Sequence, residues 1–576
     1  MSHIFQLIHF LALLCLLLHS AKADKVFELN ITTTSNTFNP DCSDYISSSA
    51  LLVNGQLPGP PIKVTRGERV QITVRNMLSE NITSEHAAIH YHGIRQYGSN
   101  FADGVPFLTQ HPIPPGQEFT HDFRVVNQAG TYFYHAHVGL QEETVFGAFI
   151  VYDSDSENNN KKLMDGPYEY DDERIIMLSE WWHRPRNQFE DFLLGPQFDF
   201  IPEADSVLVN GQTIHDPKSK LSKDCKGYSI VPVDAGKTYR LRVIGSTTFR
   251  TLGFAIAHHN LTVIEVDGEL VKPYTVPFLE VTPGQRFSVL LNTDQAPRDY
   301  AIQTSRLWAE GVDSSSNGYA LLRYNVPNKI YPNPSVTLPP MDPPILANEV
   351  PHWIWSDLEP LYGVHPIVSR SASRTIKLRS TEARMPDGTS RWFINGVSFT
   401  EPGSPILHDI YRRTRRLPET YHAQGYDAML GTYPIKYYEV VDFVLQATHK
   451  PGEPCRTHPW HTHGHSHWEI AHGPGEYDEQ RDRNIRNVPS PVYRDITLTY
   501  PELDPELEDP NGPHANEVVG CGWTKIRIIA DNPGVWAMHC HNTPHMLMGM
   551  MVALEEAPEM IQAPYISSPQ HPVAKS

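Results

Sequence analysis

Apolar and polar residues alternate along short segments of this chain. In 68–74 (ERVQITV) and 237–243 (KTYRLRV) the apolar residues occupy alternate positions, and 438–445 (YEVVDFVL) is a short, mainly apolar run. Period-two alternation is typical of a strand with one buried face, and a short apolar run is typical of a fully buried strand. No long heptad or helical repeat interrupts this pattern. The sequence therefore predicts an all-β fold of short strands.

A tight-turn motif precedes each of these segments. Val53-Asn54-Gly55-Gln56 recurs as 209–212 (VNGQ) and, more loosely, as 394–397 (INGV). Asn-Gly is a strong signal for a two-residue turn, and its recurrence at comparable places predicts one β-sandwich used three times. Three unrelated turns are the alternative, because Asn-Gly is common in β proteins.

Length and composition fit three such units. A chain of 576 residues is too long for one core, and its 49 Pro, 36 Gly and 10% aromatic residues suit short strands joined by turns. The composition shifts at the polar run 153–162 and at the proline-rich run 331–351. We therefore predict domains at 24–153, 163–330 and 352–576.

Residues 1–23 are predicted to be a signal peptide. The apolar stretch 4–18 is short and interrupted for a membrane span, and a small-x-small cleavage site follows at 21–23. Retention as an anchor is the alternative, because the start of the chain lacks Lys and Arg. No later stretch of the sequence is apolar for long enough to span a membrane. A secreted glycoprotein is consistent with sequons at Asn30, Asn81 and Asn260.

The net charge is strongly negative, at −19. Binding to phosphate groups requires clustered Lys and Arg, so nucleic acid is excluded as a partner. The acidic stretch 502–509 is interpreted as a solvated loop, with a site for a hard cation as the alternative.

The densest chemical signal is the tripeptide His539-Cys540-His541, followed by His545 and Met550. Successive side chains of a strand point to opposite faces, so the two flanking histidines share one face and Cys540 points to the other. A thiolate with two imidazoles and a distant thioether is a blue-copper ligand set. The tripeptide can therefore serve two metal sites, one on each face of its strand.

Three further histidine strings stand far from this one, at 90–92 (HYH), 135–137 (HAH) and 458–463 (HPWHTH). With 30 His in the chain, roughly one or two such triplets are expected by chance. Together the four strings offer ten imidazoles and one thiolate, which suits one mononuclear copper site and one cluster of three coppers. Zinc is the competing metal, but its structural sites are usually richer in cysteine.

These strings and their surroundings resemble the multicopper oxidases, and most closely the ascorbate oxidases, over nearly the whole mature chain. The matching motifs are IHYHG at 89–93, FADG at 101–104, GTYFYHAHVGLQ at 130–141, LSEWWH at 178–183, HPWHTHGH at 458–465 and NPGVWAMHCH at 532–541. The resemblance implies three tandem cupredoxin-like Greek-key β-sandwich domains. It also implies four copper ions per chain, with a small-molecule reductant and O2 as substrates.

Carried over by position, the resemblance assigns every copper ligand. Type 1 copper would be held by His458, Cys540 and His545 with Met550 axial, type 2 copper by His90 and His461, and the type 3 pair by His92, His135, His137, His463, His539 and His541. The strings lie in the first and third domains, so the cluster would form where those domains meet, with the middle domain as a spacer and wall. Cys540 is bonded to both neighbours and would give electrons a covalent path to the type 3 pair.

Cysteine usage agrees with an oxidising compartment. After Cys15 leaves with the signal peptide and Cys540 binds copper, an even number remains. These are Cys42, Cys225, Cys455 and Cys521, and they permit three pairings. The resemblance implies that Cys42 pairs with Cys225, which leaves Cys455 for Cys521.

Three further residues match functional positions of the family. Asp103 matches a carboxylate near the type 2 copper, where a base can deliver protons, although it could equally be a turn aspartate. In ascorbate oxidases two tryptophans flank the histidine that matches His545. One matches Trp392, for which a core position is the alternative. The other matches Phe200, which lacks the indole donor that binds a polar enediol.

Four functions stay open at this stage. The first is an oxidase of ascorbate or a diphenol, and the second is a laccase acting on phenols. The third is a ferroxidase, which would place carboxylates at the donor edge where this chain has Phe200 and Ile201. The fourth is a copper-storage cupredoxin array, which would require a broken ligand set, whereas this set is complete.

Overall fold

The computed structural model describes residues 24–562, apart from 35–37, 48–49, 79–84, 161, 163–165, 310–317, 327–334, 338–348, 416–417, 419–424 and 510. The predicted signal peptide, the Asn81 sequon and most of the run 331–351 lie outside the described residues. Strands dominate, and in the described part of the chain they form six sheets.

The first two sheets come from the N-terminal part of the chain. One has the order β2-β1-β4-β6 (Leu51–Val53, Lys25–Thr33, Arg69–Asn76, Glu118–Arg124), and the other has the order β3-β8-β7-β5 (Ile62–Thr65, Phe146–Tyr152, Gly130–Ala136, Ile89–His92). Apolar side chains from both sheets, among them Ile72 and Phe149, form one buried core. The two sheets are therefore the layers of a sandwich.

The second sandwich has larger sheets. Their orders are β10-β9-β12-β17-β14-β15 (Ser206–Val209, Asp172–Trp181, Thr238–Gly245, Arg286–Asn292, Leu261–Val266, Glu269–Val276) and β11-β19-β18-β13-β16 (Ser229–Val233, Tyr319–Tyr324, Asp299–Leu307, Thr251–Ile256, Leu279–Val281). They share a core that includes Leu241 and Phe254.

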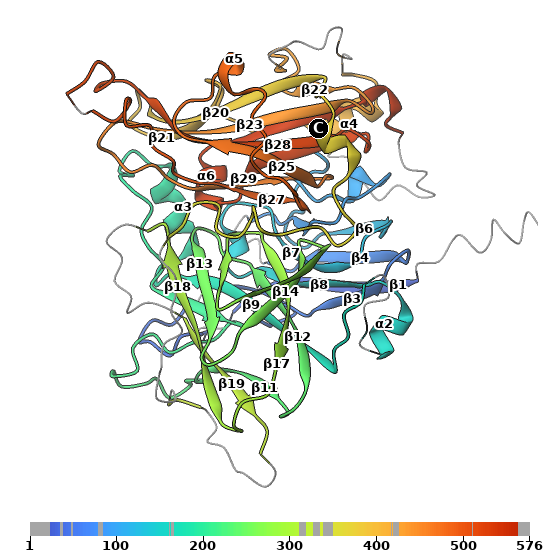
Figure 1. Ribbon diagram of the computed structural model, residues 1–576, viewed down its shortest axis with the longest axis vertical. Helices are drawn as coiled ribbons and strands as arrows, with labels where there is room; N and C mark the ends of the chain where they lie inside the picture. The colour runs from blue at the N-terminus through green and yellow to red at the C-terminus, as the bar shows by residue number, and fades with distance from the viewer. Residues whose placement is uncertain are drawn as a thin grey trace, which may run out of the picture.

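The third sandwich carries the C-terminal histidine strings. Its sheets have the orders β21-β20-β23-β28-β25-β26 (Ser390–Ile394, Arg374–Arg384, Val440–His449, Val519–Ile529, His467–Gly473, Tyr493–Arg494) and β22-β30-β29-β24-β27 (Tyr433–Ile435, Met551–Glu556, Gly534–Cys540, His458–Thr462, Ile496–Thr499). Phe443 and Trp460 belong to its core. In Figure 1 this orange and red sandwich lies above the green second sandwich and the blue first one.

The three sandwiches repeat one another in detail. Strands β1, β9 and β20 pair in parallel with β4, β12 and β23. These last three strands hold all but the first one or two residues of the predicted segments. The turns at 53–56, 209–212 and 394–397 all hold Asn and Gly at positive φ, as a type I′ turn requires. In each turn the asparagine Oδ1 accepts a backbone N–H from the neighbouring strand, at Asn30, Met177 and Arg379. This shared role confirms the predicted repeat and excludes three unrelated turns.

The helices are short connections between strands. They are α2 (Asp155–Asn160), α3 (Arg186–Leu194), α4 (Ile406–Tyr411), α5 (Glu479–Asp482) and α6 (Thr543–Leu547), with 3₁₀ turns η1 (Asn100–Ala102), η2 (Gln141–Glu143), η4 (Pro366–Ser369) and η5 (Pro558–Met560). Among the described residues, no helix is both long and apolar enough to cross a membrane. In the sequence, the polar run 153–162 falls between the strands of the first sandwich and those of the second. The exact domain boundaries remain predictions.

Both predicted disulfides are confirmed. Cys42 is bonded to Cys225, 183 positions away, and Cys455 to Cys521, 66 positions away. The first disulfide links the first sandwich to the second. Within the described residues Cys540 is the free thiol that remains.

A buried ion-pair group holds the segment after the proline-rich run against the third sandwich. His352 Nε2 lies 2.9 Å from Glu502 Oε2, and His352 Nδ1 lies 3.6 Å from Glu469 Oε1. Although burial lowers it, the hydrogen bonds and charges of these two carboxylates raise the pKa of His352 to about 9.

We expect the stability contributed by His352 to depend on pH. Since the pKa is about 9 in the folded protein and 6.5 in a free side chain, the contribution is complete below about pH 6.5 and is lost as the pH rises through about 9. Chemical denaturation of the unmodified protein and of His352→Gln should show a difference in unfolding free energy that shrinks across this range. A difference that stays constant would contradict the ion pair.

Candidate copper centres

Cys540 lies between two histidines where β24, β29 and α6 meet. Its Sγ is 3.6 Å from Nδ1 of His458 and 3.6 Å from Nδ1 of His545. His458 is the first residue of β24, and His545 lies in α6. The Met550 carbonyl accepts the Cys540 N–H at 3.1 Å, which brings Met550 alongside. His458, Cys540 and His545 therefore lie together, and the backbone of the predicted axial residue Met550 is hydrogen-bonded to Cys540.

The donor set of Cys540, His458 and His545 suits one soft metal ion. A sulfur and a nitrogen bound to one ion at about 2.3 and 2.0 Å lie about 3.5 Å apart, close to the spacing found here. Burial raises the pKa of the Cys540 thiol and lowers the pKa of His458 to about 3. These shifts disfavour charge in the bare protein, and a bound metal cation would reverse the effect on the thiol.

The other face of β29 belongs to a second, larger group of histidines. Its eight members are His90, His92, His135, His137, His461, His463, His539 and His541, all buried. His90 stacks on His463 with 3.8 Å between ring centroids, and His92 stacks on His461 at 3.7 Å. Strings separated by more than 350 positions are thus in direct contact, and the structure brings together all eight predicted cluster ligands.

Ring nitrogens face one another in this group, both within the third sandwich and between the two ends of the chain. His463 Nε2 lies 3.1 Å from His539 Nε2, and His92 Nδ1 lies 3.1 Å from His541 Nε2. Several more nitrogens are buried without a hydrogen-bond partner, namely Nε2 of His90, His135, His137 and His461. Leaving buried polar atoms unpaired is costly, so this group of nitrogens fits bound metal ions.

In several of these rings the other nitrogen, Nδ1, is hydrogen-bonded to an oxygen atom. Nδ1 donates to a backbone carbonyl at 2.8 Å in His90 and at 3.0 Å in His135, His461 and His539. A neutral imidazole that donates from Nδ1 presents a lone pair at Nε2, which is the form that binds metals. Burial and neighbouring histidines lower the pKa of His92, His135, His137, His461, His463 and His541 well below the ordinary value.

Asp103 lies within this histidine group. Its Oδ2 is 2.9 Å from His463 Nδ1, and its backbone carbonyl accepts a hydrogen bond from His90 Nδ1. The turn can pack this closely because Gly104 follows at φ +85°, where a Cβ would lie 1.8 Å from the Ile89 carbonyl oxygen. Asp103 therefore contacts one predicted type 2 ligand and one predicted type 3 ligand.

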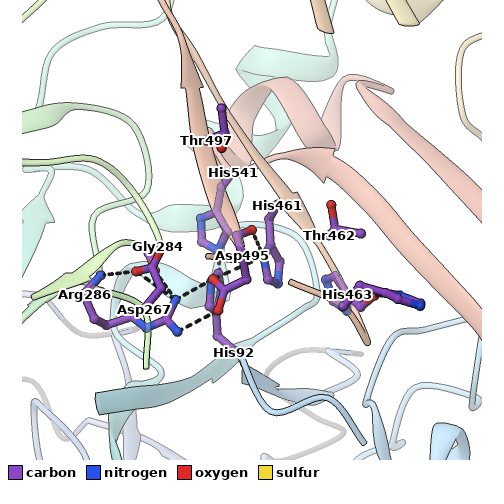
Figure 2. A network of polar contacts seen from close by, with 12 residues as sticks. His92, Asp267, Gly284, Arg286, His461, Thr462, His463, Asp495, Thr497 and His541 are labelled. Carbon is purple, nitrogen blue, oxygen red and sulfur yellow. Dashed lines mark hydrogen bonds and ion pairs between the residues drawn. The ribbon is translucent and has the colours of Figure 1, made fainter. Parts of the chain in front are cut away.

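Two acidic residues at the cluster carried no motif of their own in the sequence. Asp495 Oδ1 lies 3.2 Å from His92 Nε2 (Figure 2). Glu142 lies 3.6 Å from His135 Nδ1 and 3.7 Å from His541 Nδ1, and burial raises the pKa of Glu142 to about 8. Glu142 directly follows the motif at 130–141, which is the signal that could have drawn attention to it.

A wide cavity lies beside His545. Its volume is about 1030 Å³, and residues of the second and third sandwiches line it, among them Phe200, Arg250 and His545. Phe200 is 59% exposed and forms part of the wall. Trp392 is 2% exposed and is absent from the described residues that line the cavity, although its ring centroid is 4.8 Å from that of His545. Trp392 thus packs against His545 within the core of the third sandwich, and its part in donor binding stays a prediction.

Comparison with known proteins identifies the class. Three multicopper oxidase family models match residues 32–156, 172–327 and 399–560. The chain is 32% identical to the L-ascorbate oxidase of Cucumis sativus, over 91% of this chain and 88% of that protein. The chain therefore belongs to the multicopper oxidases, copper-dependent oxidoreductases with O2 as acceptor.

Further relatives include another ascorbate oxidase and proteins with other names. The L-ascorbate oxidase of Nicotiana tabacum is 32% identical, over 88% of this chain and 87% of that protein. The laccase-like multicopper oxidase 1 of Thermothelomyces thermophilus is 31% identical, over 87% of this chain and 82% of that protein. The solved structure of Fet3p, a multicopper oxidase that functions in iron import, has a TM-score of 0.73 and 25% identity and covers 94% of this chain and 92% of that chain.

Proposed function

We propose that this protein is a secreted oxidase that removes electrons singly from ascorbate or a diphenol and reduces O2 to water. It would hold four coppers: a type 1 ion on His458, Cys540, His545 and Met550, a type 2 ion on His90 and His461, and a type 3 pair on the six remaining cluster histidines. The similarity to L-ascorbate oxidases supports this choice of donor.

The position of His545 is the observation that carries the proposal. The residue belongs to the Cys540 group and also lines the wide cavity, so a small organic reductant bound there would lie against a ligand of the type 1 ion. Cys540 is covalently bonded to His539 and His541 of the cluster. The chain therefore joins the electron-entry site to the oxygen site by a few covalent bonds.

Copper bound at these residues would supply the one-electron chemistry and the four-electron reduction of O2. The part of the protein is to hold neutral imidazoles rigidly in a buried site and to exclude bulk water. Asp103 lies against His463 and His90, where its carboxylate can hold a proton close to the site of oxygen reduction.

A laccase acting on phenols is the second candidate, and Phe200 favours it. An exposed phenyl ring in the cavity wall suits an aromatic donor and offers a polar enediol no hydrogen bond. A ferroxidase stays the third alternative: Glu203 accepts a hydrogen bond from Arg250 Nε at 2.8 Å, but further carboxylates line the cavity, namely those of Asp205, Glu349, Glu453 and Glu508. A storage protein would have no use for a donor cavity beside His545.

Steady-state kinetics with ascorbate, a methoxyphenol and Fe(II), measured in parallel, test this proposal. We expect the highest kcat/KM for ascorbate. Efficient turnover of the phenol without turnover of ascorbate would replace the proposal with the laccase alternative. A copper-loaded protein that oxidises none of the three would favour storage.

We expect Met550→Leu to raise the potential of the type 1 site. A thioether donates weakly to copper and stabilises Cu(II), whereas a leucine side chain donates nothing. A rise on the order of 60 mV would favour reduction about tenfold and extend activity toward poorer donors. Redox titration of the blue absorption measures the change. Met546→Leu is the matched control, because Met546 packs in a different apolar cluster; an equal shift in both variants would contradict the axial assignment.

Secretion is supported by features away from the copper sites. The signal-like segment 1–23 and the two disulfides suit an oxidising compartment. Of the sequons in the described part of the chain, Asn260 is exposed and Asn30 is partly buried, so Asn260 is the better glycan acceptor.

A further inference from the structure

The middle sandwich supplies none of the predicted copper ligands, yet one of its turns reaches the cluster. Gly284 lies between β16 and β17 at φ +84°. A Cβ at this position would lie 2.8 Å from His92 Cε1 and 3.1 Å from His541 Cδ2. The backbone of the middle sandwich therefore packs directly against two cluster histidines.

Arg286, two residues further on, is fully buried and every nitrogen of its guanidinium group has a partner. Nη1 and Nη2 bind the two carboxylate oxygens of Asp495 at 2.5 and 2.7 Å. Nε donates to the Thr131 carbonyl, and Nη1 also donates to the Gly284 carbonyl, both at 3.0 Å. The guanidinium thus joins atoms of all three sandwiches. Figure 2 shows its contacts with Gly284 and Asp495. A bidentate arginine–carboxylate pair has a well-defined orientation.

Asp495 transmits that orientation to two histidines from different sandwiches. Its Oδ1 lies 3.2 Å from His92 Nε2, and its backbone carbonyl accepts a hydrogen bond from His461 Nδ1 at 3.0 Å. The rings of His92 and His461 are stacked, 3.7 Å apart. One residue therefore fixes which nitrogen of each ring faces the cluster.

A purely structural role for Arg286 is the competing explanation, and another arginine shows what that role looks like. Arg242, also buried and also in the middle sandwich, pairs with Glu173 at 3.0 Å and donates to Thr131 Oγ1 at 2.9 Å. It links the first and second sandwiches, two of the three that Arg286 joins, but its carboxylate partner contacts none of the eight cluster histidines among the described residues.

We propose that Arg286 is a positioning residue of the copper cluster, which acts through Asp495 to hold His92 and His461 in register for metal binding. The middle sandwich then helps to position ligands of the copper cluster, in addition to being the spacer and wall that the sequence predicted. This inference rests on the proposed function for the identity of the metal. The geometry of Arg286, Asp495 and the two histidines stands independently of the electron donor.

Copper retention under a graded chelator challenge tests this inference in Arg286→Lys, with Arg242→Lys as the matched control. Partners that hydrogen-bond to metal ligands typically contribute roughly 10- to 100-fold in metal affinity. We expect Arg286→Lys to lose cluster copper at a chelator concentration lower by that factor. Its blue absorption, and the bleaching of that absorption by reductant, should stay as in the unmodified protein. Arg242→Lys should keep all its copper.

Equal copper loss in the two lysine variants, or full retention in both, would overturn the inference. Should Arg286→Lys fail to fold, Asp495→Asn decides the question, because it keeps the side-chain shape but removes the bidentate acceptor. The copper content of the unmodified protein distinguishes a failure of this inference from a failure of the proposed function. An unmodified protein that binds fewer than four coppers contradicts that function before any variant is compared.

Discussion

Replacing Cys540 with serine should remove the blue colour, which comes from absorption of red light. It should also reduce oxidase activity far more than the replacement of a residue that only hydrogen-bonds to a ligand, which typically costs roughly 10- to 100-fold. The serine hydroxyl does not ionise as a thiol does and is a poor ligand for copper. Without the bond between Sγ and a type 1 copper, a donor could still dock at His545 but its electrons would have no efficient entry.

The measurement is copper content, visible absorption and O2 consumption on the same preparation of Cys540→Ser. The backbone of β29 and the cluster histidines are unchanged by the substitution, so the protein should retain three coppers instead of four. A variant that still oxidises ascorbate at the unmodified rate would refute electron entry at Cys540. Loss of all copper would refute the separation of the two sites.

The converse experiment removes a cluster ligand and leaves the entry site intact. His137→Ala deletes an imidazole whose buried Nε2 has no hydrogen-bond partner and whose ring lies 5.3 Å from that of His539. We expect O2 reduction to be lost, because four electrons can no longer be collected at one place. The blue absorption should still bleach when ascorbate is added without oxygen, and it should fail to recover in air.

Surface histidine His514 provides the control, because its side chain is 39% exposed and forms an ion pair with Glu517 away from both sites. His514→Ala should therefore behave as the unmodified protein in both assays. If His137→Ala also lost its blue colour, the cluster and the Cys540 group would form one cooperative unit, contrary to the arrangement described above.

Much of the fold was accessible from sequence because the same local signal occurs three times. An Asn-Gly turn needs positive φ at two successive residues, so the motif at 53–56 and its two copies indicated the turn type and, with the apolar segment that follows each copy, the repeat. The cluster was accessible for a similar reason: alternate residues of a strand share a face, and that rule alone separates Cys540 from its neighbours.

Functional residues that lie outside such motifs could not be predicted from the sequence. Asp495 is a single aspartate after Arg494, and nothing nearby in the sequence shows that Arg286, 209 positions earlier, will bind it. The burial of Trp392 is a second case, because a tryptophan within a strand can face a cavity or a core, and its neighbours in the sequence do not decide which. Tertiary packing decides where such side chains lie, and a single sequence gives little information about tertiary packing.

The stacking of His90 on His463 and of His92 on His461 also determines when the protein can acquire its metal during biosynthesis. Domains generally fold in the order in which the ribosome releases them, so the N-terminal histidines are in place long before their C-terminal partners exist. No fragment that ends before the third sandwich can assemble a three-copper cluster, and a complete one forms only when synthesis is essentially finished. Because metal binding adds to the free energy of folding, copper bound at the proposed cluster would then stabilise the contact between the first and last sandwiches as a final step of maturation.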